Sequence, residues 1–311
     1  MHAGANSSPA VEETVFRPPR ALGVIAGGAI AAWSAVFAVL CVFIAVGAPA
    51  EFRTFLAWAA ATTLTVLSLV FLNWTYSIAT LSYVIGRDAL EITWGFRRVI
   101  VPIENIQRMV PGRTVDEPRV EGLNWWGCHV GVADVRRIGY TLFYSTHSAP
   151  EELLYVVTDA EAYALTVEDQ AAFAEAIQAR AALGPLDFTM HRSVATGMAA
   201  LPFWRDRVAI AAASLSTIAC AILAGYVFGN YPGLPDVVQI NYPDLGGIVR
   251  IGDKSELLRI AQVGFGILVV NLVLGIIIHS RERAAGLWLL GSAGMLQVVL
   301  LAAAIVAFER A

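Results

Sequence analysis

Five long apolar runs without a charged side chain restrict the possible folds of this chain more than any other feature. They occupy residues 21–50, 54–73, 208–228, 260–279 and 284–308. About 20 mainly apolar residues make a helix long enough to cross a bilayer, and each run reaches that length. Core helices of soluble proteins seldom extend so far without a charge. The sequence therefore predicts an α-helical integral membrane protein with about five transmembrane helices.

The first two runs are separated only by a short turn around Glu51 and Arg53. Ala48-Pro49-Ala50 has the small-x-small form of a signal peptidase site. However, the apolar run before it exceeds the usual 7 to 15 residues of a signal peptide, and the preceding tail carries Glu12 and Glu13. We interpret residues 21–74 as an uncleaved helical hairpin that follows a flexible tail at 1–20.

Arginine and lysine near the ends of spans prefer the cytoplasmic side, which sets the orientation. With the N-terminus inside, the inner flanks hold Arg17, Arg20, Arg87, Arg192, Arg205, Arg207, Arg281 and Arg283. The outer flanks hold Arg53, Arg250, Lys254, Arg259 and Arg310. This bias predicts a multi-pass protein of the cell membrane whose polar middle stretch faces the cytoplasm.

Polar residues inside the spans indicate packing between helices. Asn271 and Gln297 fall near the middle of neighbouring runs, which favours an interhelical hydrogen bond over a substrate site, because no run contains Asp, Glu, Lys or Arg. Gly23 and Gly27 offer a face for close helix approach. The runs after the middle stretch, residues 208–308, form three transmembrane helices with an outer loop at 229–259.

The middle stretch has the two-residue alternation of short strands. We predict strands at 77–85, 89–94, 97–101, 103–110, 139–144, 153–158 and 162–165. A helix follows, with Thr166 and Asp169 as its capping box and an end near Leu183 and Gly184. The pattern predicts one all-β barrel or sandwich at 75–183, closed by a C-terminal α-helix and joined by a linker at 184–207 to the next span.

Three segments carry a resemblance to a known family. They are Leu90-Glu91-Ile92 through Val101-Pro102-Ile103-Glu104-Asn105-Ile106, then Leu154-Tyr155-Val156-Val157-Thr158, then Leu165-Thr166-Val167-Glu168-Asp169-Gln170-Ala171-Ala172-Phe173. Together they resemble the bacterial pleckstrin-homology-like (PH) domain, over about a third of the chain. The resemblance implies a domain that lies next to transmembrane helices, and it makes self-association plausible.

The outer loop carries two fainter signals. Residues 234–242, with Gly246, Gly247 and Lys254, are similar to a segment of a bacterial membrane family of unknown function, but Asn241 replaces its histidine. A polar hairpin is the simpler interpretation. The run from Gly247 to Ser255 approaches a phosphate-binding loop, yet Asp253 would oppose a phosphate and no βαβ unit surrounds it.

No arrangement in the sequence indicates catalysis, a cofactor or a metal. Cys41 and Cys220 lie in apolar runs and Cys128 is alone in the polar middle stretch, so the sequence offers neither a zinc site nor a disulfide framework. Cys128 and His129 are neighbours on an expected strand, so they point to opposite faces. We therefore expect a protein that is not an enzyme.

Binding residues are the remaining candidates. Arg97 and Arg98 follow a Trp-Gly-Phe turn, Arg136 and Arg137 precede a strand, and Trp125 and Trp126 form an aromatic loop. Basic turns attract anionic lipid headgroups, and exposed tryptophan inserts at the bilayer interface. A solvated turn and a core tryptophan pair are the simpler alternatives. Nothing suggests nucleic acid.

Two functions of different classes remain open. The first is a scaffold or docking module that is anchored in the membrane and binds a protein or its own copies through the PH-like domain. The second is an accessory subunit of a transporter or membrane enzyme, with the spans as the contact surface. An intramembrane enzyme is disfavoured because the spans lack acidic residues, lysine and arginine.

Overall fold

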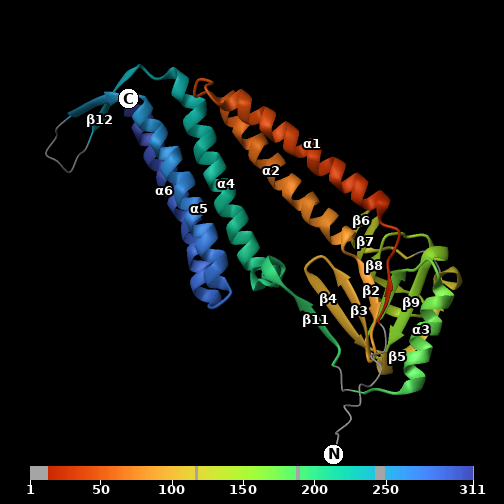
Figure 1. Ribbon diagram of the computed structural model, residues 1–311. Coiled ribbons are helices and arrows are strands. Elements are labelled where there is room, and N and C mark those ends of the chain that lie inside the picture. The colour runs from red at the N-terminus through yellow and green to blue at the C-terminus, as the bar shows by residue number, and fades with distance from the viewer. Residues whose placement is uncertain (1–12, 116–117, 187–189, 242–248, 311) are drawn as a thin grey trace, which may run out of the picture. The chain divides into compact units, whose positions relative to one another are not determined.

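The computed structural model describes residues 13–115, 118–186, 190–241 and 249–310. The chain folds as two compact units, Met1–Trp33 with Leu67–Ala200 and Ser34–Val66 with Leu201–Ala311. The long helices are α1 (Ala21–Ala45), α2 (Phe52–Ala79), α4 (Arg207–Asn230), α5 (Ser255–His279) and α6 (Arg283–Arg310) (Figure 1). All five are long and apolar enough to cross a membrane, which confirms the prediction of a multi-pass membrane protein.

The first unit contains two β-sheets. The five-stranded sheet has the order β1 (Thr14–Phe16), β2 (Ser82–Ile85), β3 (Ala89–Trp94), β4 (Arg97–Pro102) and β11 (Arg192–Ala195). The six-stranded sheet has the order β5 (Ile106–Pro111), β9 (Leu153–Thr158), β10 (Ala162–Thr166), β8 (Gly139–Ser145), β7 (Cys128–Val135) and β6 (Glu121–Trp125). Neighbouring strands are antiparallel except β10 and β8.

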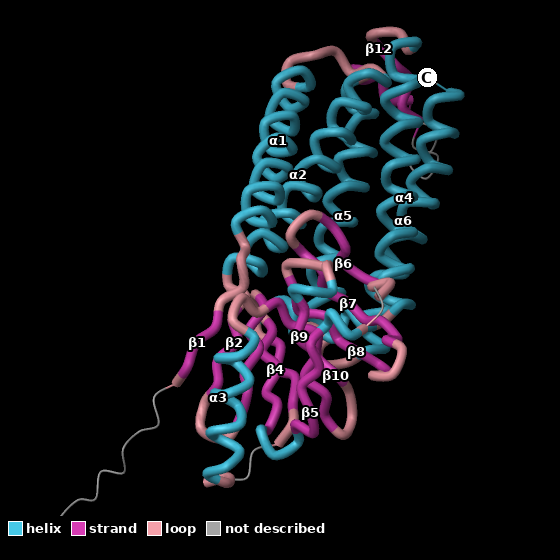
Figure 2. Tube along the Cα trace, turned by 90° about the vertical axis from the view of Figure 1, so that its right-hand side faces the viewer, coloured by secondary structure: helices cyan, strands magenta, loops and turns pink. Residues whose placement is uncertain are grey.

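An apolar core lies between these sheets. Tyr83 and Ile92 from the first sheet pack with Val156 and Tyr163 from the second, and helix α3 (Gln170–Leu183) adds Phe173. Figure 2 shows α3 alongside the strands. Among the described strands no pairing joins one sheet to the other, so the domain is a helix-covered sandwich and not a closed barrel.

Both ends of the first sheet extend beyond the expected domain. We predicted a flexible tail through residue 20, but Thr14–Phe16 pairs with β2, and Phe16 packs its ring on Phe173 at 5.0 Å. We predicted a linker at 184–207, but Arg192–Ala195 pairs with β4. Residues 1–12 lie outside the described part of the chain. The two segments nearest the membrane helices are therefore built into the sheet.

Several predicted boundaries were wrong. Ser77 to Ala79 belong to α2 and not to the first strand. Thr166 is a strand residue whose hydroxyl accepts from the amide of Thr146 at 3.1 Å, so it does not cap a helix. Helix α3 begins at Gln170, and the carboxylate of Asp169 caps it by accepting from the Ala172 amide at 2.9 Å.

The second unit contains α4, α5 and α6. Their core includes Leu223, Ala261 and Ala304. The amide of Gln297 donates to the backbone carbonyl of Gly264 in α5 at 2.7 Å, so the predicted interhelical bond has that carbonyl as its partner and not Asn271.

The outer loop contains a small hairpin, β12 (Val237–Asn241) and β13 (Val249–Asp253). Residues 242–248, where part of both faint sequence signals falls, lie outside the described chain. The ammonium of Lys254 pairs with Asp236 at 2.7 Å and lies over the ring of Tyr231. The hydrogen bond to Asp236 raises the pKa of Lys254, so this side chain stays charged and has a structural role in the hairpin.

Candidate functional site

The turn between β3 and β4 is packed against the last turn of α2. Gly95 has φ +57°, and a Cβ at this position would collide with Ser77, so glycine is required on both grounds. Its amide donates to the hydroxyl of Thr80 at 3.0 Å. The Phe96 ring lies 5.1 Å from that of Tyr76. These contacts fix the turn, and the two arginines that follow it, at the end of a membrane-spanning helix.

Strand β11 lies beside this turn and completes a groove. The Thr196 amide donates to the carbonyl of Phe96 at 2.8 Å, and Arg192 lies opposite Ile100 in the strand register. The resulting hollow has a volume of about 290 Å³. We call it the basic groove; its lining residues are Thr93, Gly95, Phe96, Arg97, Arg98, Ile100, Arg192, Val194 and Thr196.

Arginine dominates the charge of the basic groove. Arg97, Arg98 and Arg192 are all exposed. Arg98 pairs with Glu91 at 3.2 Å, and no acidic residue lines the hollow. Arg98 and Arg192 share one face of the sheet, whereas Arg97 is next to Arg98 on β4 and its side chain points to the other face, at the rim of the hollow. The guanidinium groups of Arg98 and Arg192 can donate paired hydrogen bonds to a phosphate or carboxylate over the hollow. Sequence reasoning found Arg97 and Arg98 but treated Arg192 only as a flanking charge.

The other candidate residues lie elsewhere in the same unit. Trp125 and Trp126 are at the tip of the β6–β7 hairpin, where Trp125 is partly buried and Trp126 is 75% exposed. Arg136 and Arg137 lie in the turn at the other end of β7, where the Arg137 carbonyl accepts from Arg108 at 3.1 Å. None of these four residues lines the basic groove.

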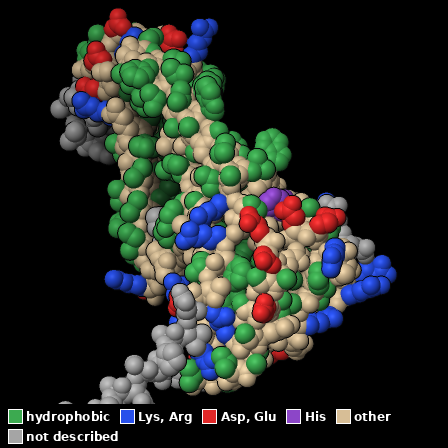
Figure 3. All heavy atoms as spheres, turned by 45° about the vertical axis from the view of Figure 1, so that its right-hand side comes forward, with side chains coloured by type: hydrophobic (Ala, Val, Ile, Leu, Met, Phe, Trp, Pro, Cys, Tyr) green, Lys and Arg blue, Asp and Glu red, His purple; other side chains and the backbone are tan. Residues whose placement is uncertain are grey.

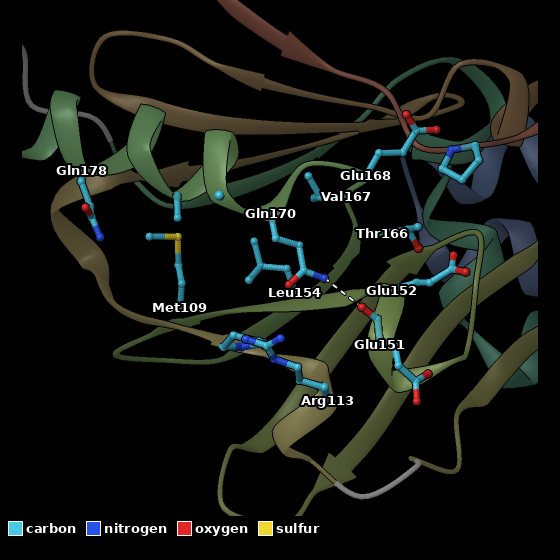
Figure 4. Close-up of a pocket in the computed structure, with 14 residues that line it drawn as sticks. Met109, Arg113, Glu151, Glu152, Leu154, Thr166, Val167, Glu168, Gln170 and Gln178 are labelled. Atoms are coloured by element: carbon cyan, nitrogen blue, oxygen red, sulfur yellow. Dashed lines mark hydrogen bonds between the residues drawn. The ribbon is translucent and has the colours of Figure 1, made fainter.

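A second hollow lies between α3 and the six-stranded sheet, with a volume of about 820 Å³ (Figure 4). Its floor includes Met109 and Leu154, and Gln170 spans it by donating to the Glu151 carbonyl at 3.1 Å. Glu151, Glu152 and Glu168 outnumber Arg113 around it. Because its charge is opposite to that of the basic groove, this hollow cannot attract the same ligands.

The comparison with known families covers the strands of the first unit except β1 and β11. Residues 81–181 match the family described as bacterial PH domain. The chain carries a bacterial PH domain. No curated protein and no solved structure matches the chain. The matched range contains Arg97 and Arg98, whereas β1 and β11 flank it, so Arg192 reaches the basic groove from an added edge strand of the PH domain.

A buried polar cluster connects the segment before β11 to the PH domain. The Tyr163 hydroxyl donates to the Glu161 carboxylate and lies 2.7 Å from Nε2 of His191. Burial, and then the bond to Glu161, raise the pKa of Tyr163 far above its usual range. The hydroxyl therefore stays protonated and acts as a hydrogen-bond donor that positions the start of β11.

A charged cluster in the second unit was missed by the sequence analysis. Asp206 accepts from the amides of Val208 and Ala209 and so caps α4, and it also accepts from His279 at 3.1 Å and Arg283 at 2.6 Å. The Arg283 guanidinium, followed by His279, holds the pKa of Asp206 well below its usual range. An aspartate immediately before an apolar run was the available signal.

Proposed function

We propose that the chain is a docking protein without catalytic activity, whose PH domain works at the cytoplasmic face of the cell membrane and binds anionic lipid headgroups. The observation that carries this proposal is the packing of the Gly95–Phe96 turn on Tyr76, Ser77 and Thr80. These residues follow the charge-free run 54–73 of α2, at the level where a spanning helix meets the headgroups. The basic groove therefore opens where lipid phosphates lie.

The distribution of charge on the molecule agrees with this placement. Figure 3 shows hydrophobic side chains along the long helices, with charged side chains at helix ends and on the strand-bearing unit. Arg20, whose guanidinium donates to the Ala79 carbonyl, joins the domain-side ends of α1 and α2. An arginine-rich end favours the cytoplasmic side, where the leaflet is anionic.

A domain that is held by helices at both ends cannot leave the membrane. The chain enters the PH domain directly from α2 and leaves it through β11 toward α4. What it recognises must therefore come to it, by lateral diffusion in the bilayer or from the cytoplasm. This constraint favours a scaffold that gathers lipids, partner proteins or further copies of itself at a fixed place.

Removal of the three groove arginines tests the lipid proposal. The full-length chain in a neutral detergent would be titrated with dioctanoyl phosphatidylglycerol, and bound lipid would be counted by native mass spectrometry. A membrane-surface arginine contributes about 1 kcal/mol. The variant Arg97→Ala/Arg98→Ala/Arg192→Ala should therefore bind roughly 100-fold more weakly.

The matched control removes three exposed arginines elsewhere in the domain, as Arg108→Ala/Arg113→Ala/Arg119→Ala. It should bind the anionic lipid as the wild type does, and dioctanoyl phosphatidylcholine should bind none of the proteins specifically. Inorganic phosphate that competed as well as the lipid would assign the groove to a free anion. An equal loss of lipid affinity in both triple variants would mean that net charge alone accounts for the effect, and it would refute the site.

A further inference from the structure

The tip of the β6–β7 hairpin is fixed against the two N-terminal membrane helices. Gly127, at φ +76°, contacts Gly23 of α1 so closely that a Cβ would lie 2.6 Å from the Gly23 Cα. In α1, a Cβ at Gly27 would lie 2.7 Å from the Trp125 indole. The predicted close-approach face of α1 is therefore occupied in part by a β-turn (Figures 1 and 2).

Trp125 completes this attachment from the side of α2. Its ring lies 5.4 Å from Phe71 and 6.3 Å from Trp74, with an edge-on geometry toward Phe71. Such aromatic pairs contribute about 0.5–1.5 kcal/mol beyond the area they bury. The hairpin tip thus has a defined height along both helices.

That height corresponds to the boundary of the hydrocarbon core. About 20 residues cross the core. If 20 residues are counted along each helix from the turn that carries Glu51 and Arg53, they comprise residues 26–45 of α1 and 54–73 of α2. Gly27, Phe71 and Trp74 lie at the domain-side limits of these ranges. Trp125 packs on these three residues, so it lies at the same level.

We propose that the β6–β7 hairpin is a membrane-inserted wedge, in which Trp125 and Gly127 attach the turn to α1 and α2 and Trp126 enters the lipid interface. Trp126 is 75% exposed although its two neighbours in the turn are partly or fully buried. Tryptophan favours the boundary between headgroups and acyl chains because its ring is apolar and its N–H needs a polar partner. The bilayer is the occupant that lies at this level.

This proposal does not depend on the basic groove. The groove is formed by β3, β4 and β11, whereas the wedge is formed by β6 and β7, and they contact α2 through different residues. Loss of anionic-lipid binding would leave the wedge intact, and an uninserted hairpin would leave the groove intact. The two ideas can therefore fail separately.

Site-specific quenching in vesicles tests the wedge. The full-length chain with Cys41→Ala would carry Trp126→Cys, labelled with bimane in detergent and reconstituted into vesicles of phosphatidylcholine and phosphatidylglycerol. We expect a blue shift on reconstitution, a loss of quenching by aqueous iodide, and strong quenching by lipids that carry a nitroxide near the headgroup. Cys128 and Cys220 are buried, which limits background labelling.

The matched control is Tyr140→Cys in β8, whose register places it beside Asp134 toward the opposite end of β7. Tyr140 is also exposed, so a label there should remain open to iodide and respond little to nitroxide lipids. Equal iodide quenching at positions 126 and 140 would overturn the proposal. So would protection at position 126 from both quenchers, which would place a second copy or another protein over the tip.

Discussion

Replacement of Gly127 by alanine is expected to detach the β6–β7 hairpin from α1. Alanine at φ +76° adopts a left-handed backbone at a cost of about 1–2 kcal/mol. The new Cβ also meets the backbone of Gly23, and overpacking of this kind costs about 1–3 kcal/mol. Hydrogen exchange of the segment 121–135 in the reconstituted full-length chain should rise by roughly 30-fold or more.

Two further variants separate strain from contact. Gly139 also has a left-handed backbone, at φ +94°, but no atom would touch its Cβ, so Gly139→Ala should cost only the strain. Gly23 has a helical backbone, and its Cβ would lie 2.5 Å from the Gly127 carbonyl oxygen. Alanine normally stabilises a helix relative to glycine, so destabilisation by Gly23→Ala would identify the contact itself. Faster hydrogen exchange of the segment 121–135 in Gly139→Ala than in Gly127→Ala would argue against the attachment of the hairpin to α1.

The sequence was sufficient to predict the parts of the fold that depend on regular patterns. Span length predicted five membrane helices, and alternation predicted β3 with its correct ends. The ends of β9, an apolar segment that is buried throughout, were also predicted correctly. Both signals reflect local physics: helix length must match bilayer thickness, and alternate side chains of a strand face one core. These features therefore need no knowledge of distant partners.

The β6–β7 hairpin was not predicted as strands because its glycines interrupt the alternation. Gly122 and Gly131 face each other across the pair, and a Cβ at Gly122 would lie 2.8 Å from the Cα of Gly131. Such close backbone approach is visible only when both strands are in place. The residues 124–127 therefore looked like a loop, although the aromatic pair within it was noticed.

Parts of the candidate site depend on contacts between residues that are far apart in sequence. Arg192 joins Arg97 and Arg98 only because β11 pairs with β4, and a four-residue strand inside an expected linker gives little local signal. The Thr166 error has a similar cause. Thr166 and Asp169 fit a capping box by spacing, but pairing with β9 keeps Thr166 in the sheet and leaves the cap to Asp169.

Replacement of Asp206 by alanine is expected to cause a large loss of stability in the three-helix unit. The change removes the cap of α4, the partner of Arg283, and the partner of His279, whose side chain is only 3% exposed. A buried polar group left without its partner destabilises more than the loss of an exposed ion pair. The thermal midpoint of the full-length chain in detergent should fall clearly.

Asp206→Asn separates these contributions, because an asparagine side chain can still cap α4 but carries no charge. Its midpoint should lie between those of the wild type and Asp206→Ala at neutral pH. The pKa of Asp206 is lower in the folded state than its ordinary value of 3.8. Its charge therefore stabilises the unit fully at a pH above 3.8, and this stabilisation is lost as the pH falls further. The difference in midpoint between the wild type and Asp206→Asn should therefore narrow only in acid.

Asp236→Ala, which breaks an ion pair whose carboxylate is 90% exposed, is the control and should change the midpoint little. An Asp206→Ala midpoint no lower than that of Asp236→Ala would mean that the cluster does not hold the three helices together.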